Sequence, residues 1–201
     1  MLKKKWIALF ALVAGLLVPS LASAAKATEA VKAKQAQLFV LVGQPKTEAQ
    51  QGKLRALFDE MLAYDKFARG SLGDEWDGRT DDEKKRFSEL LTELVRSNYK
   101  KNLKKMLAYE ILYVGEETDG DATVVKTRAK HKTDAREPEI EIDFRLEVVG
   151  GSLKVVDIVT ERASLVKTYR TQFLKILRKK GFDKLLAKMQ KRLDKVNAKD
   201  Q

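Results

Sequence analysis

The sequence predicts an α+β fold, in which an antiparallel sheet of about four strands has helices packed on one face. Three observations support this class. Apolar residues alternate with charged ones from Ile140 to Val148, as in a strand with one buried face. Two glycines at 150–151 then allow a tight reversal into the apolar run 153–160. From Ser164 the apolar spacing changes to three and four residues, which indicates a helix lying on the sheet.

The N-terminus has the pattern of a secretory signal peptide. Lysines at 3–5 precede an apolar run at 6–18 and small residues at 22–24. The apolar run is too short to span a bilayer, so we expect residues 1–24 to be removed and a soluble single domain to remain at 25–201. The pattern suits export into a bacterial periplasm, and a eukaryotic secretory route stays open. The chain has no cysteine, so its core alone must hold the fold together.

Helices are predicted before the sheet. Apolar faces over 28–42 and 53–64 indicate two amphipathic helices, and Asp65 is expected to cap a short helix after them. Thr80 and Glu83 have the spacing of a capping box, followed by the apolar stripe of a long helix.

The remaining elements follow in order. Residues 106–117 are expected to form a strand, and 125–129 alternate in the same way beside a basic outer face. After the central hairpin and its helix, residues 183–197 carry a final amphipathic helix.

Basic residues are concentrated at the C-terminal end. The chain has a formal net charge of +11, and from Arg162 onward 13 basic residues face 3 acidic ones. Export disfavours nucleic acid as the partner. The basic stripe is either a solvated face or a docking surface for anionic head groups or an acidic protein. It consists of Lys184, Lys188, Lys191 and Lys195.

Catalytic and metal chemistry find little support. His131 is the single histidine, so a metal site built on several imidazoles is excluded, and we expect no metal. His131, Asp157 and Ser164 could be written as a triad, but nothing around Ser164 resembles a strained nucleophile turn. We therefore expect no enzyme. The apolar stripes fit either a filled core or a ligand cavity, because periodicity does not distinguish the two.

Two blocks of motifs resemble the MlaC family, also called the toluene tolerance family, of periplasmic phospholipid-binding proteins. The first block comprises Phe-Ala-Arg at 67–69, Leu-Gly-Asp-Glu-Trp at 72–76 and Tyr-Lys-Lys-Asn-Leu at 99–103. The second comprises 142–145, 156–158, 161–166, 169–173 and 181–183. Arg162 and Ala163 depart from the glycine and larger aliphatic residue of the family pattern, and Leu153 stands where an aromatic residue often occurs.

The resemblance implies a soluble phospholipid carrier with an apolar cavity between sheet and helices. Such a carrier exchanges lipid between an inner-membrane ABC transporter complex with an MCE-domain protein and an outer-membrane lipoprotein complex, which maintains outer membrane lipid asymmetry. It uses no cofactor, holds phospholipid as cargo and is expected to be a monomer. The basic stripe would then contact a partner. The residues expected to contact lipid are Met61, Phe67, Leu72, Trp76, Phe87, Leu91, Leu94, Tyr99, Ile142, Phe144, Ile158, Ala163, Val166, Tyr169 and Phe173.

Two other hypotheses stay open. The first is a periplasmic interaction protein with a filled core, whose basic face docks on an acidic partner or a membrane surface. The second, more distant, is an exported hydrolase that uses Ser164. Phospholipid that remains bound during purification would favour the carrier.

Overall fold

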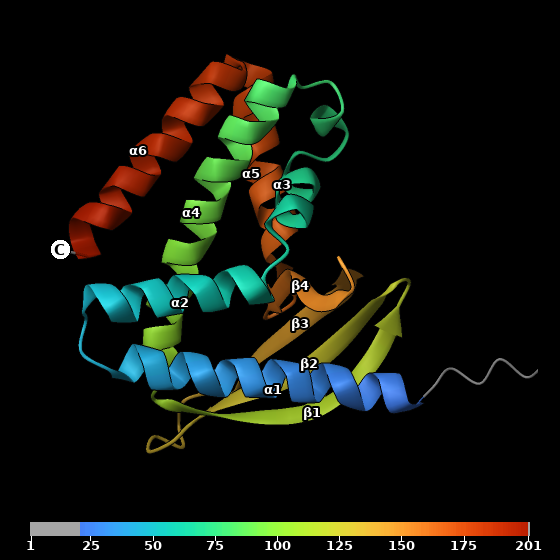
Figure 1. The fold of residues 1–201 in the computed structure, drawn as a ribbon, viewed down its shortest axis with the longest axis vertical. Helices are drawn as coiled ribbons and strands as arrows, with labels where there is room; N and C mark the ends of the chain where they lie inside the picture. The colour runs from blue at the N-terminus through green and yellow to red at the C-terminus, as the bar shows by residue number, and fades with distance from the viewer. Residues whose placement is uncertain (1–20, 201) are drawn as a thin grey trace, which may run out of the picture.

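The structure, a computed structural model, describes residues 21–200 (Figure 1). Residues 1–20, which make up most of the predicted signal peptide, lie outside the described residues. The helices are α1 (Leu21–Gly43), α2 (Glu48–Met61), α3 (Tyr64–Leu72), the short 3₁₀ helix η1 (Gly73–Trp76), α4 (Asp81–Met106), α5 (Leu165–Lys180) and α6 (Phe182–Asp200). The strands are β1 (Tyr109–Asp119), β2 (Ala122–His131), β3 (Ile140–Val149), β4 (Ser152–Thr160) and β5 (Ala163–Ser164).

The strands form one antiparallel sheet in the order β1-β2-β3-β4-β5, which confirms the predicted α+β class. The sheet has a fifth strand beyond the four predicted. It follows a tight turn in which Glu161 and Arg162 have φ values of 49° and 64°. This strand has only two residues, so it has no alternation that a sequence pattern could reveal.

The predicted central hairpin is confirmed. Gly150 and Gly151 turn the chain with φ values of 59° and 79°, a region that glycine adopts without steric cost. In the middle of the sheet Phe144 pairs with Val125 on one side and Ile158 on the other, and all three side chains are buried. The buried face ends earlier than the alternation predicts, because Val148, close to the turn, is 69% exposed.

Helix α3 begins differently from the prediction. Its N-cap is Ala63, and Asp65 lies in the first turn instead of capping it. The sheet determines this start, because the Ala63 backbone N–H donates to the Val155 carbonyl at 2.9 Å and Leu62 forms a parallel bridge with Val155. A contact with β4 far along the chain therefore overrides the local capping preference.

Helix α4 has the predicted capping box. The Thr80 hydroxyl accepts from the Glu83 backbone N–H, and the Glu83 carboxylate accepts from the Thr80 backbone N–H. Below this cap Phe87 is fully buried and meets Phe173 of α5 edge to face at 5.5 Å between ring centroids. These aromatic rings fill the space between α4 and α5.

The helices form two groups above one face of the sheet (Figure 1). Helices α1 and α2 lie side by side, and α1 crosses β1 and β2. Helices α3, α4, α5 and α6 pack together as a bundle at the other end. Among the described residues no helix is long and apolar enough to cross a membrane. The arrangement leaves space between the sheet, α1 and the C-terminal half of α4.

Candidate functional site

A cavity of about 550 Å³ occupies this space. Its floor consists of apolar side chains from three strands. Ile111 belongs to β1, Ile142 and Phe144 to β3, and Ile158 to β4. The volume falls within the range of about 300–1,000 Å³ that is typical of small-molecule sites. The lining residues are Gln35, Phe39, Val95, Asn98, Tyr99, Asn102, Leu103, Lys105, Met106, Tyr109, Ile111, Ile140, Ile142, Phe144, Ile158, Thr160, Ala163, Leu165 and Thr168.

The period of the strands creates the floor. Ile140, Ile142 and Phe144 are two residues apart and so point to the same side of the sheet. In the register of β3 with β4, Phe144 lies opposite Ile158 and Ile142 lies opposite Thr160. The strand pairing therefore joins the side chains into one continuous surface.

Helix α4 supplies the roof. Val95, Tyr99, Leu103 and Met106 recur at spacings of four, four and three residues, so they share one helical face. Tyr99 also packs edge to face on Phe58 at 5.2 Å between ring centroids. Burial raises the pKa of the Tyr99 hydroxyl, so this group is neutral at physiological pH. The four roof residues Val95, Tyr99, Leu103 and Met106 are thus all uncharged.

Four polar side chains of the lining are exposed, and they define the solvent-facing rim of the cavity. Asn102, Lys105, Thr160 and Thr168 line it and are all exposed to solvent. Asn98 also lines the cavity, is half-buried and donates to the Tyr169 hydroxyl at 2.9 Å. Solvent reaches the rim, whereas the floor beneath it is apolar. This arrangement suits a ligand with a hydrocarbon part and a polar end.

Helix α1 closes the side of the cavity above β1. Gln35 and Phe39 are its lining residues. Gln35 is 6% exposed, and its side-chain carbonyl accepts a hydrogen bond from the Tyr113 hydroxyl of β1. Burial, assisted by the nearby charge of Glu29, raises the pKa of Tyr113 to about 12. A hydrogen bond between two neutral groups therefore joins this wall to the sheet.

Five of the fifteen residues predicted to contact lipid line this cavity, and the other ten lie elsewhere in the core or against it. Their contact with lipid stays a prediction. The five are Tyr99, Ile142, Phe144, Ile158 and Ala163. The ten are Met61, Phe67, Leu72, Trp76, Phe87, Leu91, Leu94, Val166, Tyr169 and Phe173.

Several of these ten have packing partners in the helix bundle. Val166 of α5 faces α3, where a Cβ on Gly70 would come within 2.7 Å of its Cγ1 atom. Tyr169 stacks on Phe173 at 5.3 Å between centroids, with an interplanar angle of 10°. Trp76 meets Phe87 edge to face at 6.4 Å. These contacts belong to the helix bundle.

Sequence reasoning missed the polar rim and the α1 wall. Asn98 and Asn102 are four residues apart and flank Tyr99 and Leu103 on α4. Asparagine at helical spacing beside an apolar stripe is a signal that could have indicated a rim. Phe39 gives no such signal, because its position over the sheet depends on how α1 packs.

The triad hypothesis can be compared with the actual hydrogen bonds. The Ser164 hydroxyl caps α5 by accepting from the Lys167 backbone N–H at 3.0 Å, and it donates to the Asp157 carboxylate. The Nδ1 atom of His131 accepts from the Asp134 backbone N–H at 2.9 Å. Each of these groups thus has a local structural partner. Among the described residues no cluster of three His, Cys, Asp or Glu could hold a metal ion.

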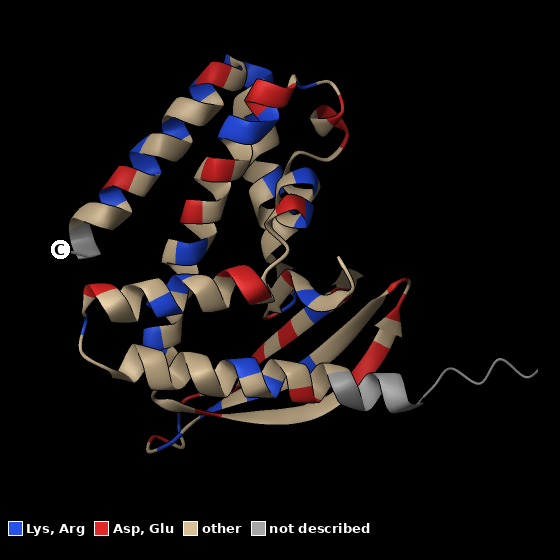
Figure 2. Ribbon diagram, viewed as in Figure 1, with Lys and Arg blue, Asp and Glu red and all other residues tan. Residues whose placement is uncertain are grey.

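The basic stripe lies on the outer side of α6, and all four lysines are exposed (Figure 2). The opposite side of α6 buries Leu185, Leu186, Met189 and Leu193, as the sequence predicts. The stripe is therefore a solvent-facing charged surface, separate from the residues that line the cavity.

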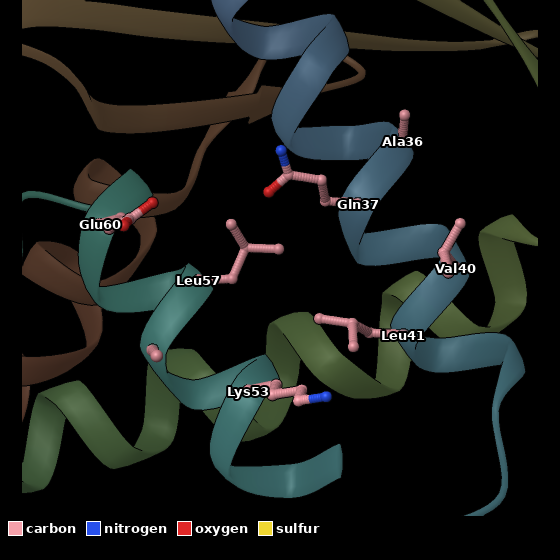
Figure 3. Close-up of a pocket in the computed structure, with 8 residues that line it drawn as sticks. Ala36, Gln37, Val40, Leu41, Lys53, Leu57 and Glu60 are labelled. Atoms are coloured by element: carbon pink, nitrogen blue, oxygen red, sulfur yellow. The ribbon is translucent and has the colours of Figure 1, made fainter. Parts of the chain in front are cut away.

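A second hollow of about 600 Å³ lies between α1 and α2 (Figure 3). Val40, whose side chain is 63% exposed, belongs to its lining, so this hollow is an open groove. Lys53 and Glu60 provide its charged residues. The other lining residues are Ala36, Gln37, Leu41, Ala56 and Leu57.

The fold and the cavity together define a class of α+β protein. In this class a cavity with an apolar floor, here of about 550 Å³, lies between the sheet and its helices. The sequence model described as "MlaC protein" matches residues 24–191, and the chain belongs to the MlaC family. This confirms the resemblance in the two motif blocks. A search of curated proteins gives no match.

A solved structure has a similar fold. It is the phospholipid-binding protein from Ralstonia solanacearum, determined in complex with a phospholipid. The TM-score is 0.69 at 19% sequence identity, and the match covers 86% of this chain and 97% of the other. At this identity the likeness concerns the fold.

Proposed function

We propose that this protein is a periplasmic phospholipid carrier that holds acyl chains in the cavity beneath α4. The proposal rests on the apolar floor of Ile111, Ile142, Phe144 and Ile158, together with exposed polar side chains in the same lining. Membership of the MlaC family supports it. The structurally similar Ralstonia protein, which was solved with a phospholipid, supports it as well.

The energetics favour such a cavity. Moving a methylene group from water to an apolar site gains about 0.8 kcal/mol, so a chain of about sixteen carbons gains on the order of 12 kcal/mol. A bilayer offers nearly the same gain. The carrier can therefore exchange lipid with a membrane complex at little net cost, while unassisted passage through water is slow. No covalent bond needs to form or break.

The polar rim is the proposed position of the head group. Lys105 and Asn102 on α4 and Thr168 on α5 belong to this rim and are exposed. A lysine can pair with a phosphate, while the amide and hydroxyl groups donate hydrogen bonds to its oxygens. The head group would remain hydrated there, so its charge need not be buried.

A further part of the proposal concerns the compartment in which the protein works and the complexes with which it exchanges lipid. We infer that the protein works in a periplasm and exchanges lipid between an inner-membrane ABC transporter complex with an MCE-domain protein and an outer-membrane lipoprotein complex. The signal-peptide pattern and the family support this inference. The exposed lysine stripe of α6 is the proposed docking surface for an acidic partner, an interaction that salt would weaken.

Mass spectrometry tests the proposed function directly. Protein produced with its leader, exported and purified without detergent should release about one equivalent of phospholipid on solvent extraction. Under native conditions its mass should exceed the chain mass by that of a phospholipid. Protein that is folded and free of lipid after this procedure would instead favour the interaction protein.

A further inference from the structure

The turn between β4 and β5 brings an arginine to the rim of the cavity. In the register of the two strands Thr160 pairs with Ala163, so Glu161 and Arg162 alone form the turn. Thr160 and Ala163 both line the cavity and are exposed. Arg162 is exposed as well, and its Cα atom lies about 3.8 Å from that of Ala163, the spacing across a trans peptide bond. The arginine is therefore next to the solvent-facing edge of the cavity.

The backbone of this turn is strained at both residues. Glu161 has a φ value of 49° and Arg162 one of 64°, as a type I′ turn requires. Glycine and asparagine are favoured in such turns, because the Cβ atom of a longer side chain crowds the backbone in this region. A glutamate and an arginine adopt it only at a cost in folding free energy. Two such residues in succession call for a structural or a functional reason.

Glu161 has a structural reason. Its backbone N–H donates to the Glu141 carbonyl at 3.0 Å, and its carboxylate accepts from the Glu141 backbone N–H at 2.6 Å. Both bonds attach the turn to β3. The Glu141 side chain alternates with the cavity-lining Ile140 and Ile142, so it belongs to the opposite face of the sheet. Glu161 thus fixes the position of the turn.

Arg162 has no such reason. Within residues 21–200 its guanidinium forms no hydrogen bond, ion pair or ring contact. The strain at this residue therefore brings no contact within the described fold. What the turn provides is a cation that stays available to a ligand at the rim.

The charges of the cavity favour an anionic group at this place. Lys105 is the one charged side chain among the lining residues, and no aspartate or glutamate belongs to them. Lysine acts on a phosphate as a point charge, whereas arginine can donate two parallel N–H···O bonds to it. Arg162 would therefore add directional hydrogen bonds to the single charge of Lys105.

We propose that Arg162 binds the phosphate of the carried lipid and selects phosphate-bearing lipids over lipids that have the same chains and no phosphate. The strained turn holds the arginine at the rim, where its N–H groups donate to phosphate oxygens while the chains lie on the apolar floor. The contact remains close to water, so its strength is that of a partly exposed ion pair. This inference rests on the proposed function, because it assigns a residue to the head group of the same cavity.

Removal of the charge tests the proposal. Arg162→Gln keeps a long polar side chain without the positive charge. Arg178→Gln is the matched control, because Arg178 is also exposed, lies on α5 and is absent from the cavity lining. The ligands are dioctanoyl phosphatidic acid and dioctanoylglycerol, which differ only in the phosphate. Each delipidated protein is titrated with each ligand below the concentration at which micelles form, and native mass spectrometry gives the Kd.

Arg162→Gln should weaken the binding of dioctanoyl phosphatidic acid by about threefold to tenfold, the effect of losing one charge-assisted contact near water. Its Kd for dioctanoylglycerol should not change, and the control should match wild type for both ligands. Added sodium chloride should reduce the difference between wild type and Arg162→Gln. Wild-type affinity of Arg162→Gln for the phosphatidic acid would overturn the inference and leave the proposed function intact. A wild-type protein that binds neither ligand would overturn both.

A glycine variant tests the strain and the phosphate contact together. Glycine adopts a φ value of 64° without steric cost, so Arg162→Gly should melt about 2–4 °C above wild type. It should lose affinity for dioctanoyl phosphatidic acid to the same extent as Arg162→Gln. This combination of higher stability and weaker phosphate binding is expected of a turn that is strained for binding. A folded Arg162→Gly protein that binds the phosphatidic acid as tightly as wild type would overturn the proposal, even if Arg162→Gln failed to fold.

Discussion

A carboxylate placed in the cavity floor should abolish lipid retention. Ile142 lines the floor on β3, so Ile142→Glu would put a carboxyl group beneath the bound hydrocarbon. Without lipid, water can enter and hydrate that group. With lipid, the carboxyl group loses this hydration and must be buried without a partner, which costs roughly 3 kcal/mol even in its neutral form. We expect affinity to fall by about 100-fold or more.

The assay measures lipid occupancy and folding together. Purified Ile142→Glu should lack phospholipid by mass spectrometry while its circular dichroism spectrum matches wild type. Val148→Glu is the matched control, because it makes the same type of substitution on the same strand at a side chain that is 69% exposed. The defect should diminish at low pH, since lipid burial raises the pKa of the introduced carboxyl and favours its protonated form. A folded Ile142→Glu protein with full lipid occupancy at pH 7 would refute a cavity at this position.

Three further predictions concern the fold. Thr80→Ala removes the capping box of α4 and should lower the free energy of unfolding by about 1 kcal/mol in urea denaturation; no change would show that the cap contributes nothing. Phe87→Ala leaves a void against Phe173 and should cost about 3–5 kcal/mol, measured in the same way, so a loss below about 1 kcal/mol would contradict the packing of the bundle. The pKa of Tyr113 is about 12 in the folded protein and 10.0 without perturbation, so the unfolded chain loses this proton first and stability should fall between pH 10 and 12. Tyr113→Phe should reduce that fall in pH-dependent urea titrations, and an identical slope would argue against the buried hydroxyl.

The central hairpin could be predicted from the sequence because apolar and charged residues alternate along β3. Alternation from Ile140 to Leu146 and the glycine pair at 150–151 determine the hairpin locally, and the structure confirms both. The start of α3 could not be predicted, because it depends on the hydrogen bond between Ala63 and Val155. A contact across the fold has no signature in the neighbouring sequence.

The candidate site was predictable on its sheet side and less so on its helical side. Ile142, Phe144 and Ile158 line the cavity because strand alternation and the pairing of β3 with β4 place them on the same face of the sheet. On α4 the apolar stripe serves two purposes. Leu91 and Leu94 pack in the core, whereas Val95 and Tyr99 reach the cavity. Helical periodicity identifies the buried face, but the positions of α1, α5 and α6 decide which part of it faces a void.

The most direct measurement is a crystal structure of the exported protein as purified, without added lipid or detergent. We expect continuous hydrocarbon density from the floor at Ile142 and Phe144 toward the rim at Lys105 and Thr168. A cavity that is filled by the protein's own side chains, or that contains only ordered water, would contradict the carrier.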